Sequence, residues 1–347
     1  MNSTDLNNQS QTLPLFEFRD LAYLVLLPLL FGIAWLVPQR YWHSISNVLV
    51  TVLLVGPGLL GRLLVQQISA ATAGTTLAAN AKTIARSFVR NKIKVQLEYL
   101  RSLRPGGWRC ELELQGEDVL QRALKRRSGV ILWVTPSTSS DLVVKRCLHQ
   151  YGWSIAQLSS YTHGYSSSRF GVRFINAMKR RVEDRYIARR MIIYPGNARE
   201  AVAEINERLS RNEVIVITAV KNEAGRSAKT TVLSALLPLG GGAIGFAHNT
   251  GCAVLPVFCF RDTDKSQCPR YRVVIRTALD IDSRQPKHQV FPDALRNFGT
   301  LVEQHAVAVP DQWNGWSNLI TTSPVSGYRQ RLWKWLHKPP LNEKKSV

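Results

Sequence analysis

Short, predominantly apolar runs, separated by stretches of helical pattern, most constrain how this chain folds. The runs occupy residues 129–134 (GVILWV), residues 213–220 (EVIVITAV) and the segment that follows Gly251 (CAVLPVFCFR). A strand that is apolar on both faces is typical of a parallel sheet that helices cover on both sides. Helical patterns at 141–152 and 196–212 alternate with these runs. The sequence therefore predicts an α/β fold with a mixed, largely parallel sheet flanked by helices.

Local signals set the limits of several elements. The predicted helix at 196–212 has Asn197 as its N-cap and Glu200 as the second member of a capping box. Gly152 and Gly251 should end the helices that precede them, because glycine adopts the left-handed conformation that closes a helix. Further predicted elements are a helix within 74–100, a strand at 110–116, a short helix at 117–127, a helix that begins near Ala243 and a strand at 271–281.

Two long apolar stretches follow a polar N-terminal segment of residues 1–20. They occupy residues 21–37 and 45–61, and prolines interrupt them at Pro28 and Pro57. Each is close to the minimum of roughly 17–25 residues that a membrane-spanning helix needs. A helical hairpin, a single span with an interfacial helix, and two core helices of a soluble domain all remain open. We expect membrane attachment, because long uncharged apolar runs are costly to expose to water.

The chain is strongly basic. It has 45 lysines and arginines against 24 aspartates and glutamates, which gives a formal net charge of +21. Such a surface attracts anionic partners, among them lipid headgroups, nucleic acid and acidic carrier proteins. The sequence has no zinc-finger spacing, aromatic RNA-recognition box or helix-turn-helix signature, so we expect no nucleic-acid partner.

Basic residues gather in two places. Those in residues 169–190 either bind lipid phosphates or an acidic carrier protein, or form a solvated helix face. The tail at 328–340 (YRQRLWKWLHKPP) alternates basic and apolar residues, as an interfacial helix or a peripheral packed helix does. We expect the first cluster to bind substrate through Arg169, Arg173, Arg180, Arg181 and Arg185, and Lys179, Arg189 and Arg190 belong to the same run.

Three stretches of the chain carry a resemblance to one family: residues 112–136 (LELQGEDVLQRALKRRSGVILWVTP), residues 237–261 (LPLGGGAIGFAHNTGCAVLPVFCFR) and residues 309–316 (VPDQWNGW). In this order they resemble the lysophospholipid acyltransferase superfamily, in particular the bacterial lipid A late acyltransferases (lauroyl/myristoyl acyltransferases). The first stretch resembles the lead-in to the histidine–acid motif of that family, the second its glycine-containing loop, helix and strand, and the third its C-terminal box. The resemblance implies a glycerolipid acyltransferase-like fold for residues 66–322, after membrane-associated apolar helices at 21–65 and before a basic amphipathic tail at 323–347.

The resemblance also implies a reaction and a site. A fatty acyl group moves from an acyl carrier protein or coenzyme A thioester to a lipid hydroxyl, with no other cofactor and no metal. The family uses a histidine as general base and an acidic residue, five positions later, that orients it. Here the acid falls on Asp141, but Pro136 occupies the position of the histidine.

Other residues of the sequence are candidates for the missing roles. His163, in the polar loop at 161–171, is either a substitute base or an ordinary loop histidine. Asp141 is either a member of the site or part of a helix N-cap. Gly240, Gly241 and Gly242 precede a predicted helix, where they either cradle a phosphate or allow close packing.

Two functions follow from these interpretations. The first is a membrane-associated acyltransferase that acts on a hydroxyl of a glycolipid or lysolipid, as in lipid A biosynthesis, with an altered base. The second is a catalytically silent relative that binds lipid or acyl carrier protein, or that serves as a partner subunit in envelope or polysaccharide assembly. We favour the enzyme, on the bacterial inner membrane with its main domain on the cytoplasmic face.

Overall fold

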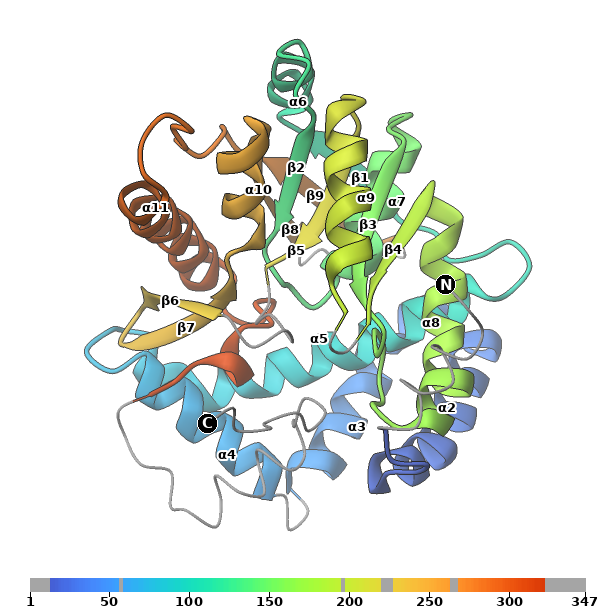
Figure 1. Ribbon diagram of the computed structural model, residues 1–347. Helices are drawn as coiled ribbons and strands as arrows, with labels where there is room; N and C mark the ends of the chain where they lie inside the picture. The colour runs from blue at the N-terminus through green and yellow to red at the C-terminus, as the bar shows by residue number, and fades with distance from the viewer. Residues whose placement is uncertain (1–12, 56–58, 195–196, 220–226, 263–267, 322–347) are drawn as a thin grey trace.

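A computed structural model describes residues 13–55, 59–194, 197–219, 227–262 and 268–321 (Figure 1). The predicted basic tail and most of the predicted polar N-terminal segment lie outside the described residues. Within the described part, helices surround a central sheet, and a group of N-terminal helices lies against one end of it (Figure 1).

Seven strands form the central sheet in the order β1-β9-β8-β2-β5-β3-β4. The neighbours from β8 to β4 pair in parallel, whereas β9 pairs antiparallel with β8, and β1 pairs in parallel with β9. The predicted mixed, largely parallel sheet is therefore confirmed. The strands are β1 (Glu111–Gln115), β2 (Val130–Val134), β3 (Ile155–Ser160), β4 (Arg189–Ile193), β5 (Val214–Thr218), β8 (Ala253–Arg261) and β9 (Arg270–Ile275).

Alternate residues of β2 enter two different cores. Trp133 belongs to one core, in which its ring stacks on Phe298 with 3.8 Å between centroids. Leu132 belongs to the other. Because side chains alternate across a strand, the continuous apolar run buries both faces of the sheet, as predicted. Helices α9 (Arg199–Ser210), α10 (Gly242–Thr250) and α11 (Lys287–Ala308) supply the first core, and α6 (Glu117–Leu124) and α7 (Ser140–Gln150) supply the second.

Helix α5 (Ala81–Ser102) runs across one end of the sheet (Figure 1). Its first half enters the first core through Ile84 and Phe88, and its second half enters the other core through Val95 and Tyr99. The helix predicted within 74–100 is therefore confirmed, with the bounds Ala81–Ser102. The helix therefore links the two cores at the end of the sheet where the parallel strands finish.

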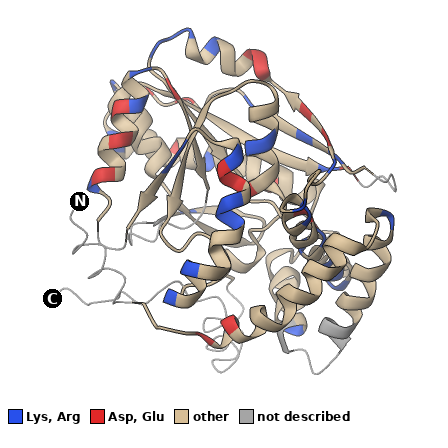
Figure 2. Ribbon diagram, turned by 90° about the vertical axis from the view of Figure 1, so that its right-hand side faces the viewer, with Lys and Arg blue, Asp and Glu red and all other residues tan. Residues whose placement is uncertain are grey.

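Three helices precede α5: α2 (Phe18–Leu36), α3 (Trp42–Val55) and α4 (Leu59–Ala71). All three contact α5. After its first turn α2 has no charged residue, and it is almost uncoloured in Figure 2. Among the described residues, no helix is both long enough and apolar enough to cross a bilayer. The expectation of membrane-length apolar helices in this region is therefore unsupported.

The observed ends of the helices agree only in part with the ends that the sequence predicts. Gly152 and Gly251 adopt left-handed φ angles of 81° and 71° after α7 and α10, as predicted. The predicted N-cap lies one residue too early, because α9 begins at Arg199 with Ala198 as its N-cap. The side-chain oxygen of Asn197 nevertheless accepts the backbone N–H of Arg199 at 3.2 Å, while its backbone forms an isolated bridge with Tyr194.

Other elements are not predicted by the sequence patterns. The segment that reads as a loop from residue 237 completes an antiparallel hairpin of β6 (Ser227–Val232) and β7 (Ala235–Gly240). Helix α8 (Asn176–Glu183) follows a π-helical turn at Gly171–Ile175. The short 3₁₀ helices are Gln39–Tyr41, Ala78–Asn80, Asp184–Tyr186 and Trp316–Asn318.

Candidate functional site

The candidate site lies at the carboxyl end of β2, where the strand is followed by a loop and then by α7. Parallel sheets bind ligands outside the carboxyl ends of their strands, next to the point where successive connections diverge. Here β2 connects through α7 towards β3 on one side, and β5 connects through α10 to β8 on the other side of β2. Asp141 stands in the first turn of α7, and therefore at this edge.

The loop before α7 is held by the segment that follows α11. The backbone N–H of Thr138 donates to the carbonyl of Gln312 at 2.7 Å, and that of Asn314 donates to the carbonyl of Pro136 at 3.0 Å. The side-chain amide of Gln312 also pairs with both backbone groups of Arg261 in β8, at 2.7 and 2.8 Å. The three stretches that carry the family resemblance thus meet at one edge of the sheet.

The loop that carries His163 is fixed from α8. The side-chain oxygen of Asn176 accepts the backbone N–H groups of Tyr165 and Ser166 at 2.7 and 3.0 Å. Its amide nitrogen donates to the carbonyls of Thr162 and Ser166 at 3.1 and 2.8 Å. Gly164 has a φ of 148°, and a Cβ there would lie 2.3 Å from Asn176. The glycine therefore permits the close approach on which the position of His163 depends.

Glu183, at the end of α8, is the centre of a buried ionic cluster. Its side chain is 0% exposed. Lys145 of α7 donates to it at 2.8 Å, Arg190 of β4 at 3.1 Å, and the hydroxyl of Tyr99 at 3.0 Å. Burial alone would raise the pKa of this carboxyl, but Lys145, His163 and Lys179 hold the pKa well below its usual range. Glu183 is therefore ionised.

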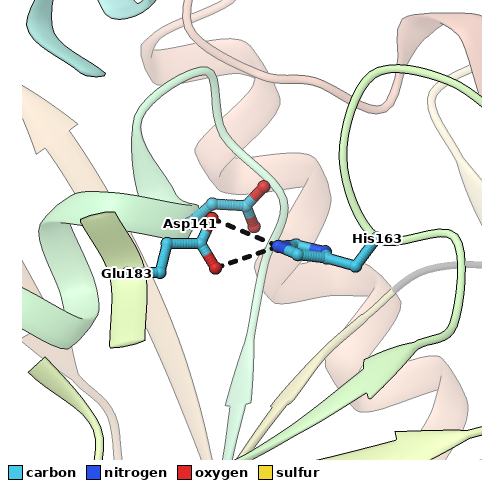
Figure 3. Close-up of side chains that lie close together, drawn as sticks. All are labelled: Asp141, His163 and Glu183. Atoms are coloured by element: carbon cyan, nitrogen blue, oxygen red, sulfur yellow. Dashed lines mark hydrogen bonds and ion pairs between the residues drawn. The ribbon is translucent and has the colours of Figure 1, made fainter. Parts of the chain in front are cut away.

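His163 points its Nε2 atom at both oxygens of Glu183, at distances of 2.9 and 3.1 Å (Figure 3). Burial lowers the pKa of His163 more than Glu183 raises it, so the ring is neutral near pH 7. An ionised carboxylate only accepts hydrogen bonds, so the proton of the neutral ring sits on Nε2 and the lone pair remains on Nδ1. A histidine in that state can act as a base.

Asp141 lies beside this pair. The ligand atoms of Asp141, His163 and Glu183 all lie within 4.8 Å of one another. Lys179 donates to Asp141 at 2.7 Å and lies 3.8 Å from Glu183, so it bridges the two carboxylates. Burial would raise the pKa of Asp141, but Lys179, Lys145 and His163 together hold the pKa well below its usual range. Asp141 therefore belongs to the ionic cluster and makes no N-cap hydrogen bond for α7.

The same three residues form a poor site for a divalent metal ion. Two carboxylates and an imidazole are suitable ligands in type. However, Lys145 and Arg190 already bond to Glu183, and Lys179 already bonds to Asp141. These cations neutralise the carboxylates and would repel an added metal ion. The cluster is instead suited to hold an ionised carboxylate against a neutral imidazole.

The predicted basic cluster of residues 169–190 divides into structural and exposed members. Arg180 donates to the carbonyl of Val172 at 2.9 Å, and Arg185 to that of Ser102 at 2.7 Å. Lys179 forms an ion pair with Asp141 and Arg190 forms one with Glu183, so both belong to the ionic cluster. Arg189 forms an ion pair with Glu204. Arg169, Arg173, Arg181, Arg185 and Arg189 are all exposed. Part of the run therefore bonds within the protein, and substrate binding through Arg169, Arg173, Arg180, Arg181 and Arg185 stays a prediction.

The glycines Gly240, Gly241 and Gly242 connect β7 to α10. A Cβ on Gly241 would lie 2.1 Å from the ring of Phe291 in α11, whereas a Cβ on Gly242 would meet nothing closer than 3.9 Å. Close packing therefore accounts for Gly241 in the described structure.

We expect Gly241→Ala to lower the free energy of unfolding by about 1–3 kcal/mol, because the added methyl group overpacks the contact with Phe291. Gly242→Ala is the matched control and should change it by less than about 0.5 kcal/mol. Urea denaturation measures both, and Phe291→Leu in the Gly241→Ala chain should recover part of the loss. A phosphate cradle at Gly241 would instead show reduced activity at unchanged stability.

The sequence predicted Asp141 and His163 as separate candidate site residues, without predicting that they lie close together. It did not predict Glu183, Lys145 or Tyr99 as members of the site. The available signal was the spacing of Lys179 and Glu183, four residues apart on one helix, which is typical of an ion pair. A second histidine, His149, lies eight residues after Asp141 on α7, where it is exposed and packs edge-on against Tyr186 with 5.7 Å between ring centroids.

The site as a whole combines a neutral imidazole, a buried carboxylate that orients it, and a partly open rim. The side chains of His163 and Asp141 are 18% and 33% exposed, so a ligand can reach them, whereas Glu183 is enclosed. This arrangement is suited to proton abstraction from a hydroxyl. The chain matches no model of a known protein family, and a search of curated proteins finds no match.

Proposed function

We propose that this protein transfers a fatty acyl chain from an acyl thioester to a hydroxyl of a glycolipid or lysolipid, as members of the lysophospholipid acyltransferase superfamily do. The donor would be an acyl carrier protein or coenzyme A thioester. The observation that carries the proposal is the pair of His163 and Glu183 beside Asp141. It supplies a base where Pro136 leaves the motif position without one.

In the proposed reaction, Nδ1 of His163 accepts the proton of the acceptor hydroxyl while that oxygen attacks the thioester carbonyl. A C–O bond forms, the C–S bond breaks, and the departing sulfur receives the proton from the imidazolium. The negative charge of Glu183 stabilises the imidazolium, and its hydrogen bond to Nε2 sets the ring orientation. Asp141, less than 4.8 Å away, adds to the same stabilisation.

The pH dependence of activity tests this assignment. His163 is active when it is unprotonated, so activity falls as pH decreases through its pKa. Because burial lowers that pKa, we expect the acid limb of the kcat/KM profile below the ordinary value of 6.5. Dodecanoyl-coenzyme A and a detergent-dispersed lysophospholipid serve as probes. An acid limb above pH 7, or one that persists in His163→Gln, would contradict the assignment.

The proposal extends to the membrane. The net charge of +21 suits a protein that works on an anionic lipid surface, such as the cytoplasmic face of a bacterial inner membrane. An acyl carrier protein is acidic and would be attracted to the same charge. A comparison of the lipids of cells with and without the gene would identify the acceptor.

A second candidate function is a catalytically silent relative that binds lipid or acyl carrier protein, or acts as a partner subunit in envelope or polysaccharide assembly. Pro136 favours it, since this residue is buried and its carbonyl accepts a hydrogen bond from Asn314 at 3.0 Å. The variant Pro136→His separates the two candidates. Activity that appears only after this substitution would favour the silent relative, whereas a wild-type activity that depends on His163 would favour the enzyme.

A further inference from the structure

Two cations of α5 lie next to each other at the contact with α3. Arg90 and Lys94 are four residues apart, which places them on one face of the helix, with about 5–6 Å between their Cβ atoms. Nη1 of Arg90 donates to the side-chain oxygen of Asn47 at 3.1 Å, and Nζ of Lys94 lies 3.1 Å from Nδ1 of His43. His43 and Asn47 are also four residues apart, on α3. The two charged groups are therefore neighbours, one helical turn apart.

A third cation, Arg261, lies at the end of β8 and therefore at the carboxyl edge of the sheet. It forms an ion pair of 2.9 Å with Glu98, whose carboxylate also accepts a hydrogen bond from Tyr271 at 2.8 Å. Glu98 follows Lys94 by four residues on the same face of α5. Arg261 therefore adds its charge to the row that Arg90 and Lys94 form, and we call these three cations the Lys94 group.

Positive charge exceeds negative charge around Lys94. Burial lowers the pKa of Lys94 to about 8, and the charges of Arg261 and Arg90 add to this shift. Two carboxylates, those of Glu98 and Asp311, act in the opposite direction, but each has a smaller effect than either arginine. Both carboxylates already accept hydrogen bonds from other side chains. Like charges this close repel one another, so a bound anion would stabilise the Lys94 group.

The chemistry of the Lys94 group suits a phosphate. Among the described residues, the side-chain hydrogen-bond partners of Arg90 are the uncharged Asn47 and Ser87. The contact between Lys94 and His43 lies at the protein surface, where a ligand can reach it. A guanidinium matches two oxygens of a phosphate, and a neighbouring ammonium adds a compact positive charge. The expected ligand is therefore a phosphate that bridges Arg90 and Lys94.

Helix α5 connects the Lys94 group with the ionic cluster around Glu183. Tyr99, whose hydroxyl donates to Glu183 at 3.0 Å, follows Lys94 by five residues, a rise of about 7.5 Å along the helix. A phosphate bound at the Lys94 group would therefore lie at the edge of the sheet that carries the candidate site. Both kinds of substrate carry a phosphate: a lysophospholipid next to its glycerol, and a coenzyme A or carrier-protein thioester at the end of its pantetheine arm.

We propose that Arg90, Lys94 and Arg261 form a binding site for a phosphate group of a substrate, in which Arg90 and Lys94 contact the phosphate and Arg261 adds positive charge. This inference deepens the proposed function, on which it rests only for the statement that the phosphate belongs to a substrate of acyl transfer. None of the three residues belongs to the basic run at 169–190, so the site is a separate one.

Isothermal titration calorimetry of the full chain tests the inference. Hexanoyl-lysophosphatidate is the probe for an acceptor phosphate, coenzyme A is the probe for a donor phosphate, and monohexanoylglycerol is the uncharged control. The double variant Arg90→Gln, Lys94→Gln should weaken the binding of one phosphate probe by about tenfold or more, because it removes two charge-assisted contacts. The probe that loses affinity identifies the substrate. The matched control is Lys82→Gln with Arg86→Gln, two exposed cations four residues apart on the same helix, and it should change affinity by less than about twofold.

The variant Lys94→Arg gives a second readout. It keeps the positive charge, so we expect it to bind the phosphate probe within about threefold of wild type. A bound phosphate should raise the pKa of Lys94 from about 8, so the wild type should take up protons when it binds the probe near that pH. Titrations in buffers of different ionisation enthalpy measure this uptake. It should be smaller in Lys94→Arg, because a guanidinium is already protonated.

Several results would overturn the inference: no binding of either phosphate probe by the wild type, equal affinities in the wild type and the double variant, or equal losses in the control pair. If the double variant does not fold, Lys94→Gln alone decides, because its charged group lies at the surface. Acyl transfer separates the two proposals. A wild type that binds the probe through the Lys94 group but transfers no acyl chain would contradict only the proposed function. A wild type that transfers acyl chains but binds both probes independently of Arg90 and Lys94 would contradict only this inference.

Discussion

Replacing Glu183 with alanine should lower the free energy of unfolding by about 3–5 kcal/mol, a large share of the stability of a typical domain. The carboxylate is enclosed and bonds to Lys145 and Arg190, whose side chains are 2% and 9% exposed. Its removal leaves those cations buried without a partner, and their desolvation is then uncompensated. Urea denaturation followed by tryptophan fluorescence measures the loss.

Glu204→Ala is the matched control, because Glu204 also pairs with two arginines but is 26% exposed. Solvent screens such pairs, so we expect a change of about 0–1 kcal/mol. A loss in Glu183→Ala no larger than that of the control would mean that the cluster around Glu183 is not formed in the folded protein.

The free energy of unfolding should depend on pH because of the same ionic cluster around Glu183. The pKa values of Glu183 and Asp141 are depressed in the folded state, so their ionisation stabilises the fold above their unfolded values of 4.5 and 3.8. That stabilisation is lost as pH falls below those values. The free energy of unfolding should therefore decrease steeply below about pH 4.5, and the decrease should be smaller in Glu183→Gln. Equal slopes in the two proteins would contradict the depressed pKa of Glu183.

Replacing His163 with glutamine should reduce acyl transfer by about 10²–10⁴-fold, the usual contribution of a general base. The glutamine amide can still donate to Glu183, so the ion cluster keeps its hydrogen bond, but it cannot accept the proton of a hydroxyl. We expect kcat to fall much more than KM rises, because the lost interaction belongs to the transition state. The free energy of unfolding, measured in parallel, separates this effect from a loss of folded protein.

Two further variants test whether the loss of activity is specific to the His163 base. His149→Gln removes an exposed histidine of α7 and should leave activity within about twofold of wild type. In His163→Ala, added imidazole should recover part of the lost activity, since it can occupy the vacated space and accept the proton. Full activity in His163→Gln would exclude His163 as the base, whatever the stability of the variant.

Much of the fold could be predicted from the sequence, because each central strand is a short, almost continuous apolar run. The run VILWV is too apolar to lie anywhere but between two layers, and it is β2, the strand between β5 and β8. The β6–β7 hairpin was not predicted, because its strand SAKTTV is mostly polar. Helix α11 contains Pro292, which masks its helical pattern, although its Phe298 stacks on Trp133.

The candidate site could be predicted only in part, for a related reason. Asp141 follows an apolar strand and His163 stands in a polar loop, and both features are visible along the chain. Glu183 is surrounded by arginines in the sequence and resembles a surface residue there. Its burial arises from contacts with Lys145 of α7 and Tyr99 of α5, which only the tertiary structure brings together. The apolar face of α2 likewise predicted attachment to a membrane but not its position beside the His163 loop.

The most direct test is the incubation of purified wild-type protein with labelled dodecanoyl-coenzyme A and a lysophospholipid, followed by separation of the lipid products. We predict label in a new ester of the acceptor, formed by the wild type and the His149→Gln variant and almost absent with His163→Gln. If the wild type transfers no label but the Pro136→His variant does, the result contradicts our proposal of an enzyme with a relocated base. It would then support the catalytically silent relative.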